Sequence, residues 1–157
     1  MRFSGTLLNA DGSLRTIEIM GPPNLEAWKE CFAILSTAYV MLDVVDLGVL
    51  NAYCKNIERL YSRYGQSTWA ILYQTDVRFR LEHLLRIKRQ YADAHDEAKA
   101  AGHDTPYEVD RPWNYSFDMG LKDSDWWLKE VNEPAMAALT KMAGPSAVEG
   151  DAPISSR

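Results

Sequence analysis

Residues 24–42 read NLEAWKECFAILSTAYVML and predict the first helix of a mainly α-helical protein. The large apolar side chains of this run recur every three or four residues, which is the period of an amphipathic helix; they are Leu25, Trp28, Phe32, Leu35, Tyr39 and Leu42. Asn24 is the expected N-cap, because its side chain can accept a hydrogen bond from a first-turn amide. Ile34, Val40 and Met41 widen the apolar stripe. We therefore expect the second half of this helix to be buried on nearly all sides.

Two longer helices follow in the sequence. Asp46 is the expected N-cap of a second helix that ends at Gly65, with an apolar stripe at Leu47, Leu50, Cys54, Ile57, Tyr61 and Tyr64. The short connection between the first two helices predicts that they pair antiparallel. The third and longest helix begins after Ser67 and runs to Ala101, where Gly102 ends it.

The segments before and after these helices complete the expected fold. Residues 1–20 predict a small N-terminal β-hairpin with its turn at residues 9–13. Residues 103–121 are expected to form a long aromatic loop. Two short helices should follow, from Ser124 to Glu133 and from Pro134 to Met142, because proline suits the first position of a new helix. We expect one domain over residues 1–143, and a disordered tail over residues 144–157.

Composition excludes several classes of protein. The chain has 157 residues, 46% of them hydrophobic, with a net charge of −5, so it is not disordered throughout. Two cysteines cannot form a disulfide scaffold, and Cys31 and Cys54 are expected to be buried free thiols. The longest apolar run, residues 31–42, is too short to cross a bilayer, and the N-terminus lacks the apolar core of a secretory signal. We expect a soluble intracellular protein, in the cytoplasm or the nucleus, that does not bind membranes.

Charge is unevenly distributed along the chain. Residues 43–92 carry 8 basic and 5 acidic side chains, whereas residues 93–133 carry 4 basic and 11 acidic ones. The basic side chains gather on the predicted helix 78–89, so the acidic segment is its expected intramolecular partner. An acidic partner protein or nucleic-acid phosphate would bind the same helix if it is left uncovered.

Asp76, Arg80 and His83 form the most notable polar row, at positions i, i+4 and i+7 of the third helix. Such a row is either a set of salt bridges beside a packed face or an acid/base constellation. We favour the first interpretation, because no nucleophile or phosphate-binding loop accompanies the row. His83, His95 and His103 lack the spacing of a zinc site. The sequence therefore predicts no catalytic residue, no metal site and no cofactor, and favours a protein that is not an enzyme.

Two segments carry a resemblance to a known family. Residues 21–32 follow the pattern GPPxLxxWxxCF, and residues 64–83 follow YGQSxWxxLxxTDxxxRxEH. Over roughly residues 20–90 the chain resembles an uncharacterised family of dinoflagellate proteins, some of which lie within retroelement-like polyproteins. The resemblance implies descent from a mobile element, but it brings no activity and no site residues to individual positions.

These observations favour a non-enzymatic protein-interaction or scaffold module, whose partner is an unidentified protein or a second copy of the chain. The expected contacts come from the basic helix 78–89 and the tryptophan-rich segment 113–127, and the candidate binding residues are Arg78, Arg80, Arg86, Lys88, Arg89, Trp113, Trp126 and Trp127. The alternative is a nucleic-acid-associated module derived from a mobile element, with the basic helix against phosphate.

Overall fold

The protein is mainly α-helical with an N-terminal β-hairpin, as the sequence predicts. The computed structural model describes the backbone of residues 1–150 and the side chains of residues 1–144. Of the tail predicted as disordered, residues 144–150 have a backbone assigned to the last helix, and residues 151–157 lie outside the described residues. The elements in chain order are β1 (Arg2–Leu8), β2 (Leu14–Met20), α1 (Leu25–Met41), α2 (Leu47–Tyr64), α3 (Trp69–Arg78), α4 (Leu84–Ala100), α5 (Pro112–Leu121), α6 (Ser124–Trp127) and α7 (Glu133–Gly150).

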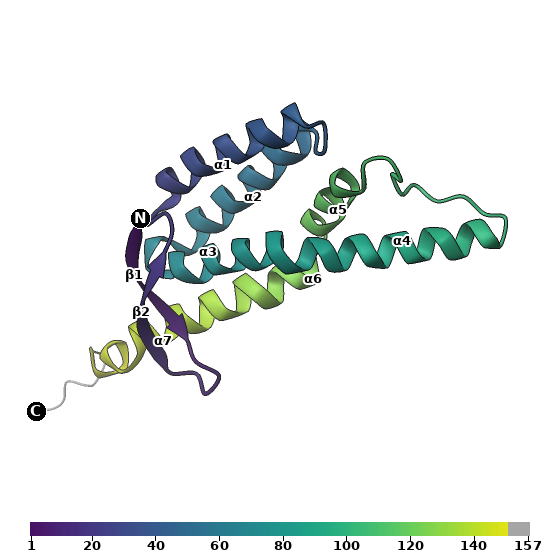
Figure 1. Cartoon of the computed structure of the whole chain (residues 1–157). Helices are drawn as coiled ribbons and strands as arrows, with labels where there is room; N and C mark the ends of the chain where they lie inside the picture. The colour runs from purple at the N-terminus through teal and green to yellow at the C-terminus, as the bar shows by residue number, and fades with distance from the viewer. Residues whose placement is uncertain (151–157) are drawn as a thin grey trace, which may run out of the picture.

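The helices form layers around the long α3–α4 axis. Helices α1 and α2 pair on one side of it, α6 and α7 run along the other side, and the hairpin crosses the end where α3 begins (Figure 1). Large aromatic side chains fill the space between the layers, and those almost completely buried include Trp69, Tyr53, Phe79 and Phe117. The rings of Tyr53, Phe79 and Phe117 meet edge-on or tilted at centroid distances of about 5–6 Å, an arrangement that adds to the gain from burial.

The β-hairpin packs on α3 and α7 through one face. Leu7 and Ile19 are buried against Ala70, Ile71 and Ala138. Gly5 allows this close approach, because a Cβ atom there would lie 2.5 Å from the Cβ of Ala70. The hairpin thus depends on the helices for its stability, as an isolated pair of strands is marginal in water.

Helix α1 begins as predicted but is far more exposed than expected. Asn24 accepts a hydrogen bond from the Ala27 amide at 2.9 Å, which confirms the N-cap. The expectation that the second half is buried on nearly all sides is wrong: Ile34 is 75% exposed and Met41 81%. The reason is that α1 packs mainly on α2, so a large part of its surface has no cover from the described residues.

Helices α3 and α4 form one long rod, interrupted by a π-helical turn over Phe79–His83. The rod ends at Gly102, whose φ of 84° lies in the left-handed region that glycine favours. Its far end projects from the molecule (Figure 1). The His95 Nδ1 atom lies 2.5 Å from Thr105 Oγ1, which links this end to the returning chain.

Two expectations for the C-terminal half are wrong. Residues 112–121, expected within a loop, form α5, whose first residue is Pro112 and whose buried face includes Phe117. The expected helix break before Pro134 is also absent, because a second π-helical turn over Leu128–Asn132 joins α6 to α7. The extra residue in that turn lets the helix continue past a proline that has no N–H to donate.

Candidate functional site

Asp76 is the centre of a buried polar cluster that joins three helices. Its carboxylate is 1% exposed and accepts hydrogen bonds from Trp28 Nε1 at 2.9 Å and Tyr53 Oη at 2.6 Å. Arg80 Nε and Nη2 complete the set at 3.2 and 2.7 Å. A buried carboxylate with donors on both oxygens is well satisfied, so the cluster ties α1 and α2 to α3.

The two side chains that contact Asp76 most closely, Tyr53 and Arg80, both have raised pKa values. Burial raises the pKa of Tyr53 well above its ordinary value, and the negative charge of Asp76 raises it further. For Arg80, burial opposes the charged form, but the hydrogen bond and charge of Asp76 outweigh burial and raise the pKa of the guanidinium. Tyr53 is therefore a neutral donor and Arg80 a permanent cation at any ordinary pH.

Arg80 also faces a small cavity between α1 and α3. The cavity has a volume of about 230 Å³ and is lined by Arg80 with Pro22, Trp28, Cys31, Phe32, Leu35 and Tyr73. Trp28 and Phe32 stack nearly parallel, with ring centroids 4.8 Å apart. The cavity therefore combines one cationic group with mostly aromatic and aliphatic walls.

His83, the third member of the predicted polar row, belongs to a separate cluster. Its Nε2 lies 3.1 Å from Asp123 Oδ2, and its Nδ1 lies 3.4 Å from Arg86 Nη1. The imidazole stacks on Trp126 with ring centroids 4.3 Å apart. Burial lowers the pKa of His83, and the charge of Asp123 offsets only part of this. With a neutral imidazole donating to Asp123 and accepting from Arg86, neither ring nitrogen is left for acid/base chemistry.

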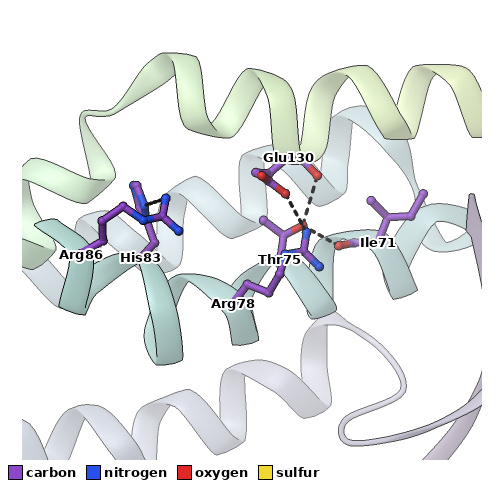
Figure 2. Close-up of polar contacts among 6 residues, drawn as sticks. All are labelled: Ile71, Thr75, Arg78, His83, Arg86 and Glu130. Atoms are coloured by element: carbon purple, nitrogen blue, oxygen red, sulfur yellow. Dashed lines mark hydrogen bonds and ion pairs between the residues drawn. The ribbon is translucent and has the colours of Figure 1, made fainter. Parts of the chain in front are cut away.

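The basic side chains of residues 78–89 differ in their surroundings. Arg78 pairs with Glu130 at 3.0 Å and also reaches Thr75 Oγ1, while Arg86 reaches His83 (Figure 2). Lys88 Nζ lies over the Trp113 ring, 4.7 Å from its centroid, in a cation–π contact. Arg86 and Arg89 are exposed, and neither makes an ion pair within the described residues. Among the described residues, acidic side chains of segment 93–133 reach this helix at Arg78 and His83, and Trp113 of the same segment contacts Lys88.

The two adjacent tryptophans are largely used inside the fold. Trp127 is 5% exposed and donates from its indole nitrogen to the carbonyl of Gly120 at 3.1 Å. Trp126 is half-buried between His83 and Phe79. Trp113, also half-buried, lies beneath Lys88. These three rings offer partial edges rather than an open aromatic surface.

The open apolar surface lies instead along α1 and at its turn into α2. A groove of about 480 Å³ between the two helices has walls that include Phe32, Ala33, Thr37, Met41, Leu47 and Cys54. Met41, Leu42 and Leu47 are 81%, 72% and 55% exposed. Three apolar side chains are therefore exposed together, as one patch, at one helix turn.

The turn that carries this patch is held in place by α5. Arg111 Nη2 lies 2.8 Å from an Asp46 carboxylate oxygen and 3.3 Å from one of Asp43. Asp46 stands at the N-cap of α2, but its side chain makes no capping hydrogen bond. Its backbone amide donates to Asn114 Oδ1 at 2.8 Å. The turn that carries Met41, Leu42 and Leu47 is thus fixed by ion pairs and a hydrogen bond to residues 111 and 114.

Both cysteines are free, and Cys31 is exposed rather than buried as expected. Cys54 is half-buried, with Sγ 3.9 Å from Glu58 Oε1, and burial raises the pKa of its thiol. Among the described residues, no three His, Cys, Asp or Glu side chains are arranged to hold a metal ion. In the same part of the chain, no helix has the length and hydrophobicity that a bilayer span requires.

Sequence reasoning missed the partners that come from other helices. The sequence pattern places Trp28 on an apolar face and does not single out Tyr53, although both donate to Asp76. The signal for Tyr53 is present in the sequence: the buried stripe of α2 shares Leu50, Ile57 and Tyr64 with the predicted one, and it has Tyr53 and Leu60 where the prediction has Cys54 and Tyr61. The sequence alone does not pair Asp123 with His83 or Glu130 with Arg78, because the partners in each pair come from different helices.

No protein-family model, curated protein or solved structure matches the chain.

Proposed function

We propose that the protein is a non-enzymatic interaction module that binds an amphipathic helix of a partner protein in the groove between α1 and α2. The observation that carries the proposal is the exposure of Met41, Leu42 and Leu47 beside that groove. Helix α1 is uncharged from Cys31 to Leu42, and helices that are apolar on all sides are normally covered. A partner would supply the cover that the described residues do not.

The shape of the groove favours a helix as the partner. The groove follows α1 from Lys29 to Met41, a distance of about 18 Å at 1.5 Å per residue, which matches three to four helical turns. Two neighbouring helices leave a linear groove in which apolar side chains of a third helix can insert at i, i+3, i+4 and i+7.

The charges near the turn favour a basic polar face on that partner. Asp43 is 86% exposed and Asp46 55% exposed, and Arg111 is the one cation that neutralises both within the described residues. Lysines flanking the apolar stripe of the partner would meet this excess of negative charge.

The test uses a synthetic leucine–lysine peptide of about four turns, designed as an amphipathic helix, and a scrambled peptide of equal composition. We expect saturable binding of the helical peptide only, with NMR shift changes at Thr37, Met41 and Leu47. The variant Met41→Glu/Leu47→Glu should abolish binding. Val109→Glu, a matched change at an apolar residue that is 60% exposed elsewhere, should leave it intact.

Three results would overturn the proposal: equal binding of the scrambled peptide, full binding by Met41→Glu/Leu47→Glu, or a stable dimer of the chain that this double variant dissociates. The last result would make the patch a self-association surface. Mass measurement by light scattering on the same samples separates it from binding of a different protein.

Exposed Arg86 and Arg89 support a second candidate, the nucleic-acid-associated module derived from a mobile element. If phosphate is the partner, binding of random-sequence DNA should weaken as salt rises, and Arg86→Gln/Arg89→Gln should reduce the salt dependence. Binding that does not change with salt would exclude this role.

A further inference from the structure

We propose that the cavity beside Arg80 is a binding site for a small apolar monocarboxylate, a property independent of the proposed interaction surface. The site would lie between α1 and α3, with the guanidinium of Arg80 on the carboxylate and the apolar group of the ligand against Trp28 and Phe32. The cationic group of the cavity accounts for the carboxylate of such a ligand, and the aromatic walls account for its apolar part.

The free donors of Arg80 are the first part of the argument. A guanidinium has five N–H groups in a planar fork. Arg80 uses Nε and Nη2 for Asp76, which leaves three N–H groups with no acceptor among residues 1–144. Nη1 and the second hydrogen of Nη2 lie on the outer edge of the group, and two parallel N–H donors there match a second carboxylate.

The rigidity of Arg80 is the second part. Its side chain is 25% exposed, and its position is set by Asp76, which Trp28 and Tyr53 hold in turn. A ligand therefore meets a cation whose orientation is already determined, so little side-chain entropy is lost on binding. Because Trp28 and Tyr53 also donate to Asp76, Arg80 is not the only hydrogen-bond donor to this carboxylate.

The cavity limits what the ligand can be. Its volume of about 230 Å³ lies below the range of about 300–1,000 Å³ that holds drug-sized ligands. A single ring or a short branched chain fits, whereas a nucleotide or an extended peptide does not. None of the other lining side chains is charged, and the Tyr73 hydroxyl already donates to the Met20 carbonyl at 3.4 Å. The acid is therefore apolar apart from one carboxylate.

The experiment titrates benzoate, phenylacetate and 3-methylbutanoate into the isotope-labelled full chain and follows the indole N–H signal of Trp28 by NMR. Benzamide is the neutral control for benzoate, since it keeps the ring but has no charge. We expect saturable shifts with at least one of the acids, and affinity for benzamide at least about tenfold lower than for benzoate, because a charged acceptor binds the guanidinium more strongly.

Two variants locate the site. Arg80→Lys keeps the positive charge but loses the fork, and should weaken binding at least about tenfold. Cys31→Trp fills the mouth of the cavity from an exposed position and should abolish binding while leaving the Asp76 cluster untouched. Arg89→Lys, an exposed arginine outside the cavity, is the matched control and should bind as the wild type does.

The proposal is wrong if none of the three acids gives saturable shifts. It is also wrong if benzamide binds as tightly as benzoate, or if Cys31→Trp retains wild-type affinity. Thermal unfolding of each variant shows whether it is folded. If Arg80→Lys does not fold, Cys31→Trp and the benzamide comparison still decide the question.

Discussion

Thr75 Oγ1 lies 3.2 Å from the carbonyl oxygen of Glu130, on the neighbouring helical segment (Figure 2). Glu130 stands four residues before Pro134, which has no N–H to offer that carbonyl. The Thr75 hydroxyl is also 2.8 Å from the carbonyl oxygen of Ile71 and accepts from Arg78. The hydroxyl has one hydrogen to share between the two carbonyls, so Thr75 of α3 is a donor within reach of the carbonyl that a proline leaves free in another helix.

Thr75→Val should destabilise the protein by about 1–3 kcal/mol, because it keeps the shape of the side chain but removes the hydroxyl donor that the Ile71 carbonyl and the partly buried Glu130 carbonyl share. Thr75→Ser keeps the hydroxyl and should cost less. Adding Pro134→Ala restores an N–H at position 134, so it should recover part of the loss in the Thr75→Val background. Urea unfolding of the wild type, Thr75→Val, Pro134→Ala and the double variant measures the coupling between positions 75 and 134. Strictly additive effects would contradict it.

Asp76→Asn should be among the most destabilising single changes, at about 3 kcal/mol or more, because it leaves the half-buried Arg80 without its counter-charge. Tyr53→Phe removes one hydrogen bond to a charged group and should cost about 2 kcal/mol. Chemical unfolding gives both values. If Asp76→Asn proves no more costly than Tyr53→Phe, the ion pair is not the main stabilising contact of the cluster.

His83 should make the protein less stable as the solution becomes acidic. Burial lowers the pKa of His83 from its ordinary value of 6.5, so below that pH the unfolded chain binds more protons than the folded chain. The stabilisation is complete above pH 6.5 and decreases as pH falls toward the folded-state value. Unfolding free energies at pH 7.5 and pH 5 should differ less in His83→Gln than in the wild type. His103→Gln, at an exposed position, should keep the wild-type difference.

Gly5→Ala should destabilise the hairpin by about 1–3 kcal/mol through overpacking, because its new Cβ would lie 2.5 Å from that of Ala70. Gly48→Ala is the matched control. Gly48 lies in α2 with no neighbour within 4 Å of the added atom, and alanine there should stabilise by about 0.5–1 kcal/mol. Thermal unfolding distinguishes the two. If Gly5→Ala and Gly48→Ala change the melting temperature equally, close packing against α3 does not explain the glycine at position 5.

Local patterns predicted the fold class, the hairpin and the N-cap at Asn24, since each depends on neighbouring residues. They failed for α5, although Pro112 is a recognised first-turn residue, because acidic and aromatic residues of low helix propensity hid the helix. They also failed for the exposure of α1, since periodicity identifies an apolar face but not whether anything covers it.

The candidate site was predictable only within one helix. The spacing of Asp76 and Arg80 placed them together correctly, whereas Trp28 and Tyr53 approach Asp76 from α1 and α2. His83 is the last residue of the π-helical turn and points to Asp123 instead. A regular helical spacing cannot express the additional residue in that turn.

The two π-helical turns, Phe79–His83 and Leu128–Asn132, also bear on ancestry. A turn closed by i→i+5 bonds holds one residue more than a regular turn, so each has the geometry of a regular helix with a single residue inserted. Relatives that diverged before these insertions should align with one gap in each segment and have regular helices there. Searches for distant relatives of this chain should therefore permit one-residue deletions at residues 79–83 and 128–132.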